Sequence, residues 1–170
     1  MTAPLLLATD SPEATRALAA VVAVRCVPGD VLLLSGDLGA GKTTFAQGFG
    51  RALGILEPVT SPTFTLVRQY SVDEGPTGIR TLFHADVYRL DHIHEIVDLG
   101  LGELVEDHGV ALVEWGDAAE PVLGRGSLAV ELAAGAEVSD RTIELTPLGP
   151  EWSDRWPAVA AAVAPWLAAP

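Results

Sequence analysis

The chain carries one lysine, Lys42, and this lysine lies inside the string Gly36-Asp37-Leu38-Gly39-Ala40-Gly41-Lys42-Thr43. The string fits G-x-x-x-x-G-K-[ST], a loop that wraps nucleotide phosphates. The other nine of the ten basic residues are arginines. A compact ammonium reaches between phosphate oxygens as a point charge, whereas a planar guanidinium fits that position poorly. The lone lysine therefore predicts a nucleotide phosphate site.

Each residue type in this glycine loop, residues 36–43, predicts a contact with a nucleotide. Glycine at positions 36, 39 and 41 permits unusual dihedral angles, and backbone N–H groups from Gly39 to Thr43 can converge on the β-phosphate. Lys42 is expected to reach the β- and γ-phosphates, Thr43 to place its hydroxyl on Mg²⁺, and Thr44 to reach the α-phosphate. The alternative is a glycine-rich turn whose lysine and threonine are merely solvated.

Two acidic residues end stretches that are typical of buried strands. Glu114 follows residues 110–113, and Asp86 follows residues 82–85. An enzyme with this loop also needs an acid at the end of a nearby strand, holding Mg²⁺ directly or through water. Two acids could divide the labour, one holding Mg²⁺ and one orienting or deprotonating the attacking water. The alternative for either residue is an exposed charge at a strand end.

The lack of a second lysine in the sequence indicates which base the nucleotide carries. Proteins of this kind that select guanine commonly use Asn-Lys-x-Asp or Thr-Lys-x-Asp, which needs a second lysine. The chain has no second lysine, so ATP is expected. The hydroxyl-rich segment Thr60-Ser61-Pro62-Thr63 follows the helix after the loop, where many such enzymes sense the γ-phosphate. A simple Ser-Pro turn explains that segment equally well.

The composition predicts a single globular domain, residues 1–170, with an acidic surface. Hydrophobic residues make up 49% of the chain and charged residues 19%, as in ordinary globular proteins. The formal net charge is −13, and such a surface repels phosphate backbones. Direct tight binding to nucleic acid or to an anionic membrane is therefore not expected. The single cysteine, Cys26, excludes an internal disulfide and fits the reducing cytoplasm.

Apolar runs and turn signals predict the elements that position these residues. In chain order they are a strand over residues 5–8, a helix from about Pro12 to Cys26, a strand over 31–35, a helix over 42–53, an antiparallel hairpin of strands over 64–72 and 79–85, short helices over 95–99 and 101–107, a strand over 110–113, strands over 128–132 and 142–145, and a last helix beginning near Trp152 or Pro157. The glycine loop thus lies between a strand and a helix, as its pattern requires. We predict an α/β fold, a three-layer P-loop NTPase-like domain with a mixed parallel and antiparallel central sheet.

Four motifs, in this order, resemble those of the TsaE (YjeE-like) family. They are the glycine loop with Thr44, Ser61-Pro62-Thr63-Phe64-Thr65-Leu66, His84-Ala85-Asp86-Val87-Tyr88-Arg89-Leu90 and Val113-Glu114-Trp115. The resemblance implies an ATPase subunit of the bacterial machinery that makes threonylcarbamoyladenosine beside the tRNA anticodon. It also implies that ATP hydrolysis supports turnover of a complex with the TsaD and TsaB proteins.

The same resemblance implies roles for particular residues. The Mg²⁺ ligands of the family correspond to Thr43 and Glu114, and its essential aspartate corresponds to Asp86. Ser61, Thr63 and Thr65 would sense the γ-phosphate, and adenine would lie near the first helix, around Ser11 and Thr15. The chain departs from the family at Ala85, where a bulkier residue is common.

An alternative function is a small-molecule or nucleotide kinase that uses the same loop. Kinases of this size usually carry several arginines on a mobile lid that shields the phosphates. The nine arginines of this chain are scattered singly, which favours hydrolysis. A nucleotide-binding regulator that barely hydrolyses is a third possibility, against which Asp86 and Glu114 argue.

Overall fold

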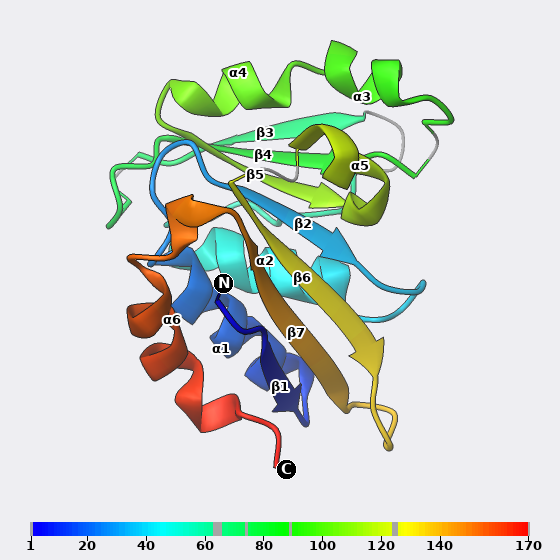
Figure 1. The fold of residues 1–170 in the computed structure, drawn as a ribbon, viewed down its shortest axis with the longest axis vertical. Helices are drawn as coiled ribbons and strands as arrows, with labels where there is room; N and C mark the ends of the chain where they lie inside the picture. Colours follow the sequence, from blue (N-terminus) through cyan, green and yellow to red (C-terminus); the bar gives the residue numbers. More distant parts are fainter. Residues whose placement is uncertain (1, 63–65, 74, 89, 124–125, 170) are drawn as a thin grey trace.

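The protein is built around one seven-stranded sheet (Figure 1). The structure is a computed structural model that describes residues 2–62, 66–73, 75–88, 90–123 and 126–169. The strands are β1 (Leu5–Thr9), β2 (Val31–Ser35), β3 (Val67–Ser71), β4 (Thr81–Asp86), β5 (Gly109–Glu114), β6 (Ser127–Ala134) and β7 (Arg141–Leu148). Their order across the sheet is β1-β7-β6-β2-β5-β4-β3. The central strands β6, β2, β5 and β4 are parallel, whereas the outer pairings β1–β7, β7–β6 and β4–β3 are antiparallel. The predicted mixed sheet and its hairpin of β3 and β4 are confirmed.

Helices cover both faces of the sheet. The α-helices are α1 (Pro12–Ala23), α2 (Lys42–Ala52), α3 (Ile93–Asp98), α4 (Leu101–Glu106), α5 (Gly116–Leu123) and α6 (Trp156–Val163), with short 3₁₀ turns η1 (Pro150–Trp152) and η2 (Ala164–Trp166). Leu32 and Leu34 of β2 pack in one core cluster with α1, α2 and α6. Val31 and Leu33 pack in the other with α3, α4 and α5. Because successive side chains of a strand point to opposite faces, this alternation confirms the three-layer arrangement.

The glycine loop joins the buried strand β2 to helix α2 and requires glycine at its first position. Gly36 has a φ of +140°, and a Cβ there would lie 2.2 Å from the carbonyl oxygen of Leu132 on β6. No side chain fits so close an approach, so the loop can pack against the end of the neighbouring strand only through glycine. Gly41, also at positive φ, precedes the first residue of α2.

The parallel strands bring the predicted site residues to one edge of the sheet. In the β2–β5 pairing Leu34 lies opposite Glu114, and in the β4–β5 pairing Asp86 lies opposite Glu114. The ends of β4 and β5 therefore lie beside the end of β2, from which the glycine loop departs. This edge of an α/β sheet is where ligands commonly bind.

The first helix is shorter than its apolar pattern predicts. Helix α1 ends at Ala23, whereas the sequence suggested an end near Cys26. The amides of Arg25 and Cys26 donate to carbonyl oxygens three residues back, those of Val22 and Ala23. This tighter hydrogen bonding turns the chain towards β2 before the apolar run is finished.

Helix α5 has no counterpart among the predicted elements. It contains Pro121 and begins directly after Trp115, which has a φ of 60° that side-chain-bearing residues rarely adopt. A Cβ on Gly116 would lie 2.5 Å from the Cβ of Leu33, so the helix starts in close contact with β2. Its formation depends on packing against the sheet, because a helix this short is unstable by itself.

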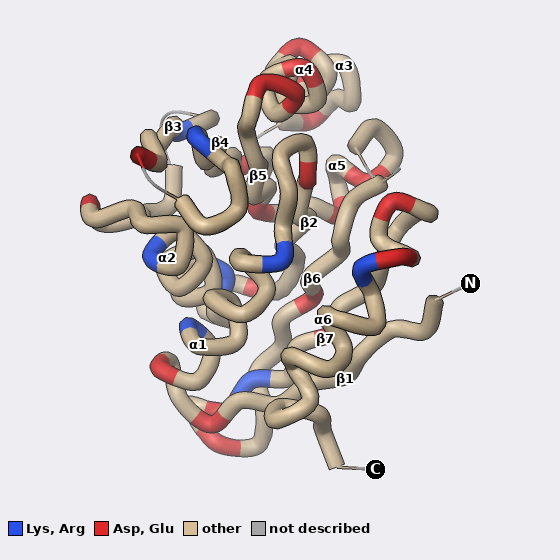
Figure 2. The backbone as a smooth tube through the Cα atoms, turned by 90° about the vertical axis from the view of Figure 1, so that its left-hand side faces the viewer, with Lys and Arg blue, Asp and Glu red and all other residues tan. Residues whose placement is uncertain are grey.

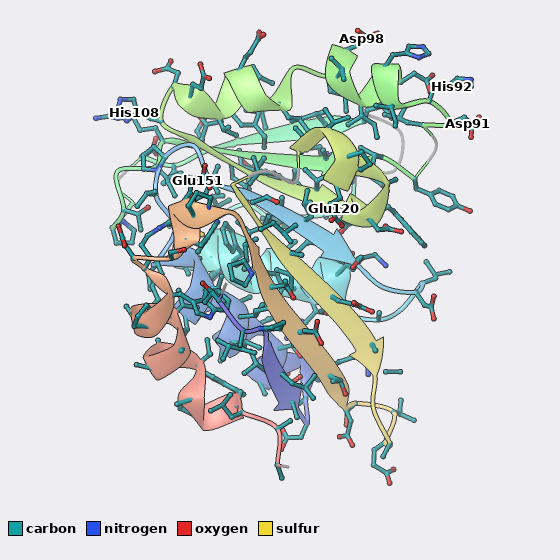
Figure 3. The ribbon with its side chains drawn as sticks, viewed as in Figure 1. Asp91, His92, Asp98, His108, Glu120 and Glu151 are labelled. Atoms are coloured by element: carbon teal, nitrogen blue, oxygen red, sulfur yellow. The ribbon has the colours of Figure 1, made fainter. Side chains whose placement is uncertain are left out.

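The surface around α3, α4 and α5 is acidic. Between Leu90 and Leu123 the sequence contains aspartates and glutamates but no lysine or arginine. Figure 2 shows red bands along α3 and α4, and Figure 3 shows Asp91 and Asp98 projecting outward beside α3. The expectation that the chain does not bind nucleic acid tightly by itself stays a prediction. Within the described ranges, no helix combines the length and the apolar character needed to cross a membrane.

Candidate functional site

A cavity of about 570 Å³ opens at the edge of the sheet where β2, β4 and β5 end. Its volume lies within the usual range for small-molecule sites. The predicted residues that line it are Gly39, Gly41, Lys42, Thr43, Thr44, Ser61, Asp86 and Glu114. The structure thus brings together residues from four segments that are far apart in the sequence.

Lys42 is a buried cation that forms no ion pair with any carboxylate in the part of the chain that the structure describes. Its residue is 7% exposed, and its Nζ donates to the carbonyl oxygens of Gly36 at 2.6 Å and Asp37 at 3.0 Å. The ring of Trp115 covers the ammonium, with its centroid 4.5 Å from Nζ. None of the ion pairs among the described residues includes Lys42, although the chain has 23 acidic residues. Since buried charges are normally paired, this arrangement suits an anionic ligand.

The two acids at the strand ends have different surroundings. Glu114 is 3% exposed, and its Oε2 accepts a hydrogen bond of 3.2 Å from the hydroxyl of Ser61. Asp86 is half-buried, and its Oδ1 accepts a hydrogen bond of 3.0 Å from the amide of Tyr88. Both acids line the cavity, but Glu114 is buried inside the protein, whereas Asp86 is more exposed.

Two aromatic side chains lie beside the acids. The rings of Tyr88 and Trp115 contact each other with centroids 4.8 Å apart. Trp115 directly follows Glu114 and holds an unfavourable positive φ, which the surrounding packing must support. The backbone conformation at Trp115 turns its ring over Lys42 instead of continuing the strand.

Some predicted residues lie outside the cavity wall. Ala40 is 3% exposed and packs in the core, while Gly36 contributes the carbonyl that Lys42 contacts. Ser11 caps α1, its hydroxyl accepting from the amide of Ala14, and the buried hydroxyl of Thr15 shares a 2.7 Å hydrogen bond with Thr9. Thr63 and Thr65 lie outside the described residues.

Arg141 is a cavity residue that the sequence reasoning missed. Its Nη2 donates to the carbonyl of Gly39 at 3.1 Å, and Nη1 donates to the carbonyls of Val138 and Asp140 at 2.8 and 2.7 Å. Arg141 also lines a second cavity of about 530 Å³, beside Asp10 and Ala14 at the start of α1. The contact with Gly39 spans 102 positions of the chain, so no local pattern signals it.

The donor set of the cavity fits Mg²⁺ in company with phosphates. The Thr43 hydroxyl and the Asp86 and Glu114 carboxylates all line the same cavity as Lys42. Mg²⁺ prefers oxygen ligands and is commonly bound through one or two carboxylates together with substrate phosphates. The sites of nucleotide, Mg²⁺ and water predicted from the sequence are therefore compatible with one cavity.

Comparisons with known proteins agree with the motifs. A family model described as "Threonylcarbamoyl adenosine biosynthesis protein TsaE" matches residues 9–143. The tRNA threonylcarbamoyladenosine biosynthesis protein TsaE of Bacillus subtilis is 43% identical over 141 residues, which cover 83% of this chain and 84% of the relative. The protein of the same name from a Nostoc species is 38% identical over 84% of this chain and 85% of its own. The crystal structure of Bacillus subtilis YdiB superposes with a TM-score of 0.71 at 34% identity, covering 97% of both chains.

Proposed function

The chain belongs to the TsaE family of threonylcarbamoyl adenosine biosynthesis proteins, and from this membership we propose that it binds ATP with Mg²⁺ and hydrolyses it. The observation that carries the proposal is the buried Lys42 ammonium, which lacks a carboxylate partner among the described residues and shares a cavity with two strand-end carboxylates. A triphosphate supplies the missing negative charge, and the carboxylates supply what a metal ion and a water need.

The polar residues predicted from the sequence have separate roles in this proposal. Lys42 would exchange its carbonyl contacts for β- and γ-phosphate oxygens, which are stronger acceptors because they are charged. Backbone amides of the glycine loop and the N-terminus of α2 would bind the β-phosphate. Thr43 and Glu114 would hold Mg²⁺, which when bound neutralises charge on the phosphate oxygens. Asp86 would orient the attacking water, and Ser61, hydrogen-bonded to Glu114, would respond to the γ-phosphate.

The nucleoside would lie towards the start of α1. The second cavity adjoins the first at Arg141 and is lined by Asp10 and Ala14, which flank Ser11. A guanidinium in this position can bind phosphate oxygens or stack on an adenine ring. Ser11 and Thr15 would then support the wall of the adenine site from behind, since their hydroxyls are engaged in local hydrogen bonds.

Hydrolysis would serve a complex with homologues of TsaD and TsaB in the cytoplasm, as the family resemblance implies. The acidic surface of this chain fits such a complex, because the partner proteins rather than this chain would bind the tRNA. An enzyme of this kind is expected to hydrolyse ATP slowly alone, since partners supply the conformational trigger.

Phosphate release from ATP, measured for the protein alone and with purified TsaD and TsaB homologues, tests this function. We expect a low basal rate of phosphate release that rises when both partners are added. The rate should not rise when either of the two partners has been denatured by heat. A rate that the partners leave unchanged would argue against the coupled ATPase. It would favour the kinase alternative, for which a phosphate acceptor would then be sought.

A further inference from the structure

His84 is a buried polar side chain directly behind the proposed metal site. It lies on β4, two residues before Asp86, and is 0% exposed. Its Nε2 lies 3.2 Å from Oε1 of Glu114, whose side chain is 4% exposed. The other buried residues of β4 are apolar, namely Leu82, Phe83 and Ala85. An imidazole in such a place needs a hydrogen-bonded role to offset its loss of water.

The hydrogen bonding of the imidazole indicates which nitrogen carries the proton. An ionised carboxylate only accepts hydrogen bonds, so the Nε2–H group donates to Glu114. The other nitrogen, Nδ1, is buried and has no hydrogen-bond partner among the described residues. An N–H group at Nδ1 would be an unsatisfied buried donor, which favours the tautomer protonated at Nε2 alone. In this tautomer, the one hydrogen bond that the His84 side chain makes with a described residue is the bond to Glu114.

Glu114 is therefore held at both of its oxygens. Oε1 accepts from His84 in the core, and Oε2 accepts from Ser61 at 3.2 Å on the cavity side. The backbone explains the first contact: in the parallel pairing Asp86 lies opposite Glu114 and His84 opposite Leu112. His84 thus reaches diagonally across to the strand end, and its donor fixes the rotamer in which Oε2 is turned to the cavity.

We propose that His84 is the positioning residue of Glu114 and sets how tightly the site binds a divalent cation with a nucleotide. The inference rests on the proposed function, because it assumes that Glu114 is a metal ligand. Partners that orient metal-binding carboxylates commonly change metal affinity by about 10- to 100-fold when removed. A His84 that only fills space would not affect metal affinity through its hydrogen bond.

The test compares two substitutions that distinguish the loss of the Nε2–H donor of His84 from a change in side-chain volume. His84→Leu keeps a buried side chain without a donor, whereas the amide nitrogen of Gln in His84→Gln can take the position of Nε2. The readout is the affinity of the protein–ADP complex for Mn²⁺, a paramagnetic substitute for Mg²⁺, titrated by electron paramagnetic resonance. Metal-free ADP affinity and thermal unfolding are measured alongside. Leu82→Met, on the same face of β4 and equally buried, is the matched control for packing changes.

We expect His84→Leu to weaken Mn²⁺ binding by about 10- to 100-fold, with metal-free ADP affinity unchanged. His84→Gln should restore most of the Mn²⁺ affinity, and Leu82→Met should retain it.

Wild-type Mn²⁺ affinity in His84→Leu would overturn the proposal, and so would an equal loss in the Leu and Gln variants. If His84→Leu does not fold, His84→Asn replaces it, because the shorter amide cannot reach Oε1; equal affinities of the Asn and Gln variants would then overturn the proposal. Failure of the wild-type protein to bind ADP and Mn²⁺ at all would instead refute the proposed function, and with it the premise of this inference.

Discussion

Asp86 and Glu114 lie opposite each other at the ends of neighbouring strands, yet their environments suit them to different work. Glu114 is buried and hydrogen-bonded at both oxygens, which favours a fixed ligand. Asp86 is half-buried, and its carboxylate accepts one hydrogen bond from the described residues, that of the Tyr88 amide. A carboxylate that must accept a proton or orient a water needs that greater access to the cavity.

Asp86→Asn is expected to lower the rate of phosphate release while leaving ATP affinity little changed. The amide keeps an oxygen that can accept from the Tyr88 backbone but loses the negative charge that a base requires. General-base contributions typically amount to about 10²- to 10⁴-fold in rate. We therefore expect single-turnover measurements to show a rate of phosphate release lowered by about 10²-fold or more. Wild-type turnover by this variant would exclude the proposed role of Asp86.

Cys26 should be chemically inert in the native protein. Burial is the main cause that raises the pKa of its thiol well above the usual range, the charge of Asp30 adds to the rise, and Arg155 opposes it. A raised folded-state pKa contributes stability that is fully present below the unfolded pKa of about 8.5 and is lost as the pH rises above it. We expect no reaction with Ellman's reagent at pH 8 without denaturant. The free energy of unfolding should fall above about pH 8.5, and less so in Cys26→Ala. Rapid labelling of the folded protein would contradict this.

The contact between α1 and α2 depends on a glycine in a helix. A Cβ on Gly48 would lie 2.4 Å from the carbonyl oxygen of Arg16 on α1. Helix propensity alone predicts that Gly→Ala stabilises a helix by about 1 kcal/mol, but overpacking costs about 1–3 kcal/mol. Backbone atoms cannot move aside easily, so the steric cost should dominate here.

Gly48→Ala is therefore expected to destabilise the protein by up to about 2 kcal/mol in denaturant unfolding, the net of the two effects. Gly102 in α4 provides the control, because nothing lies within 4 Å of a Cβ built there. Gly102→Ala should stabilise the protein by about 0.5–1 kcal/mol. If both variants gained stability, the close crossing of α1 and α2 would not depend on Gly48.

Local patterns predicted the elements that carry strong signals and missed those that depend on tertiary contacts. The apolar run of β2, the glycine loop and α2 followed from residue types alone, as did the strand ends at Asp86 and Glu114. Helix α5 could not be predicted because its start depends on contact with β2 and it contains Pro121. The position of Arg141 beside Gly39 follows from the antiparallel strand β7, whose place in the sheet no short sequence window reveals.

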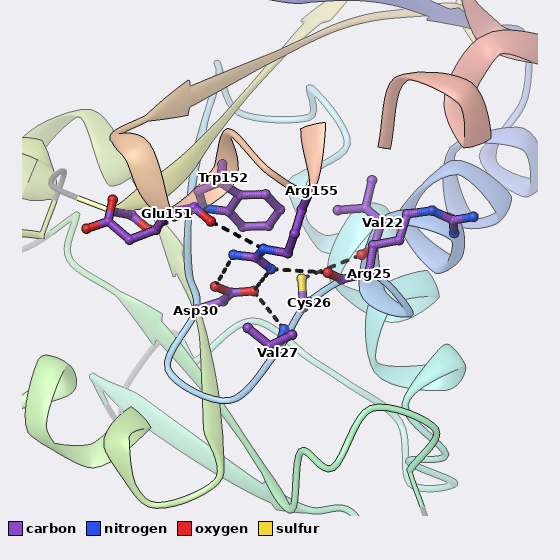
Figure 4. A network of polar contacts seen from close by, with 9 residues as sticks. Val22, Arg25, Cys26, Val27, Asp30, Glu151, Trp152 and Arg155 are labelled. Carbon is purple, nitrogen blue, oxygen red and sulfur yellow. Dashed lines mark hydrogen bonds and ion pairs between the residues drawn. The ribbon is translucent and has the colours of Figure 1, made fainter. Parts of the chain in front are cut away.

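The last third of the chain closes the molecule around its beginning. The indole of Trp156 donates to the carbonyl of Ala3 at 3.1 Å, and the amide of Ala168 donates to Leu6 on β1 at 3.0 Å. Figure 4 shows Arg155 between Asp30 and Trp152. Its guanidinium donates to both oxygens of Asp30 at 2.6 and 2.8 Å and lies 4.0 Å from the centre of the Trp152 ring. The pair with Asp30 joins α6 to the turn that leads into β2.

Arg155→Met should destabilise the protein by about 3 kcal/mol, because it leaves the carboxylate of Asp30, 6% exposed, without its cation. Arg16→Met is the control: its pair with Glu13 is longer, at 3.8 Å, and both side chains are exposed. Such surface pairs contribute up to about 1 kcal/mol. Unfolding by urea measures both variants, and equal small losses would show that the Arg155 pair does not stabilise the fold.

The most direct test of the proposed ATP site is calorimetric titration of ATP with Mg²⁺ into the wild-type protein, Lys42→Ala and Arg51→Ala. The last variant removes one positive charge from the exposed far end of the same helix and controls for net charge. We predict binding by the wild-type and Arg51→Ala proteins, with affinity lowered about 100-fold or more in Lys42→Ala, since charged hydrogen bonds to phosphate are lost. Undiminished binding by folded Lys42→Ala would contradict the assignment of this cavity as the phosphate site.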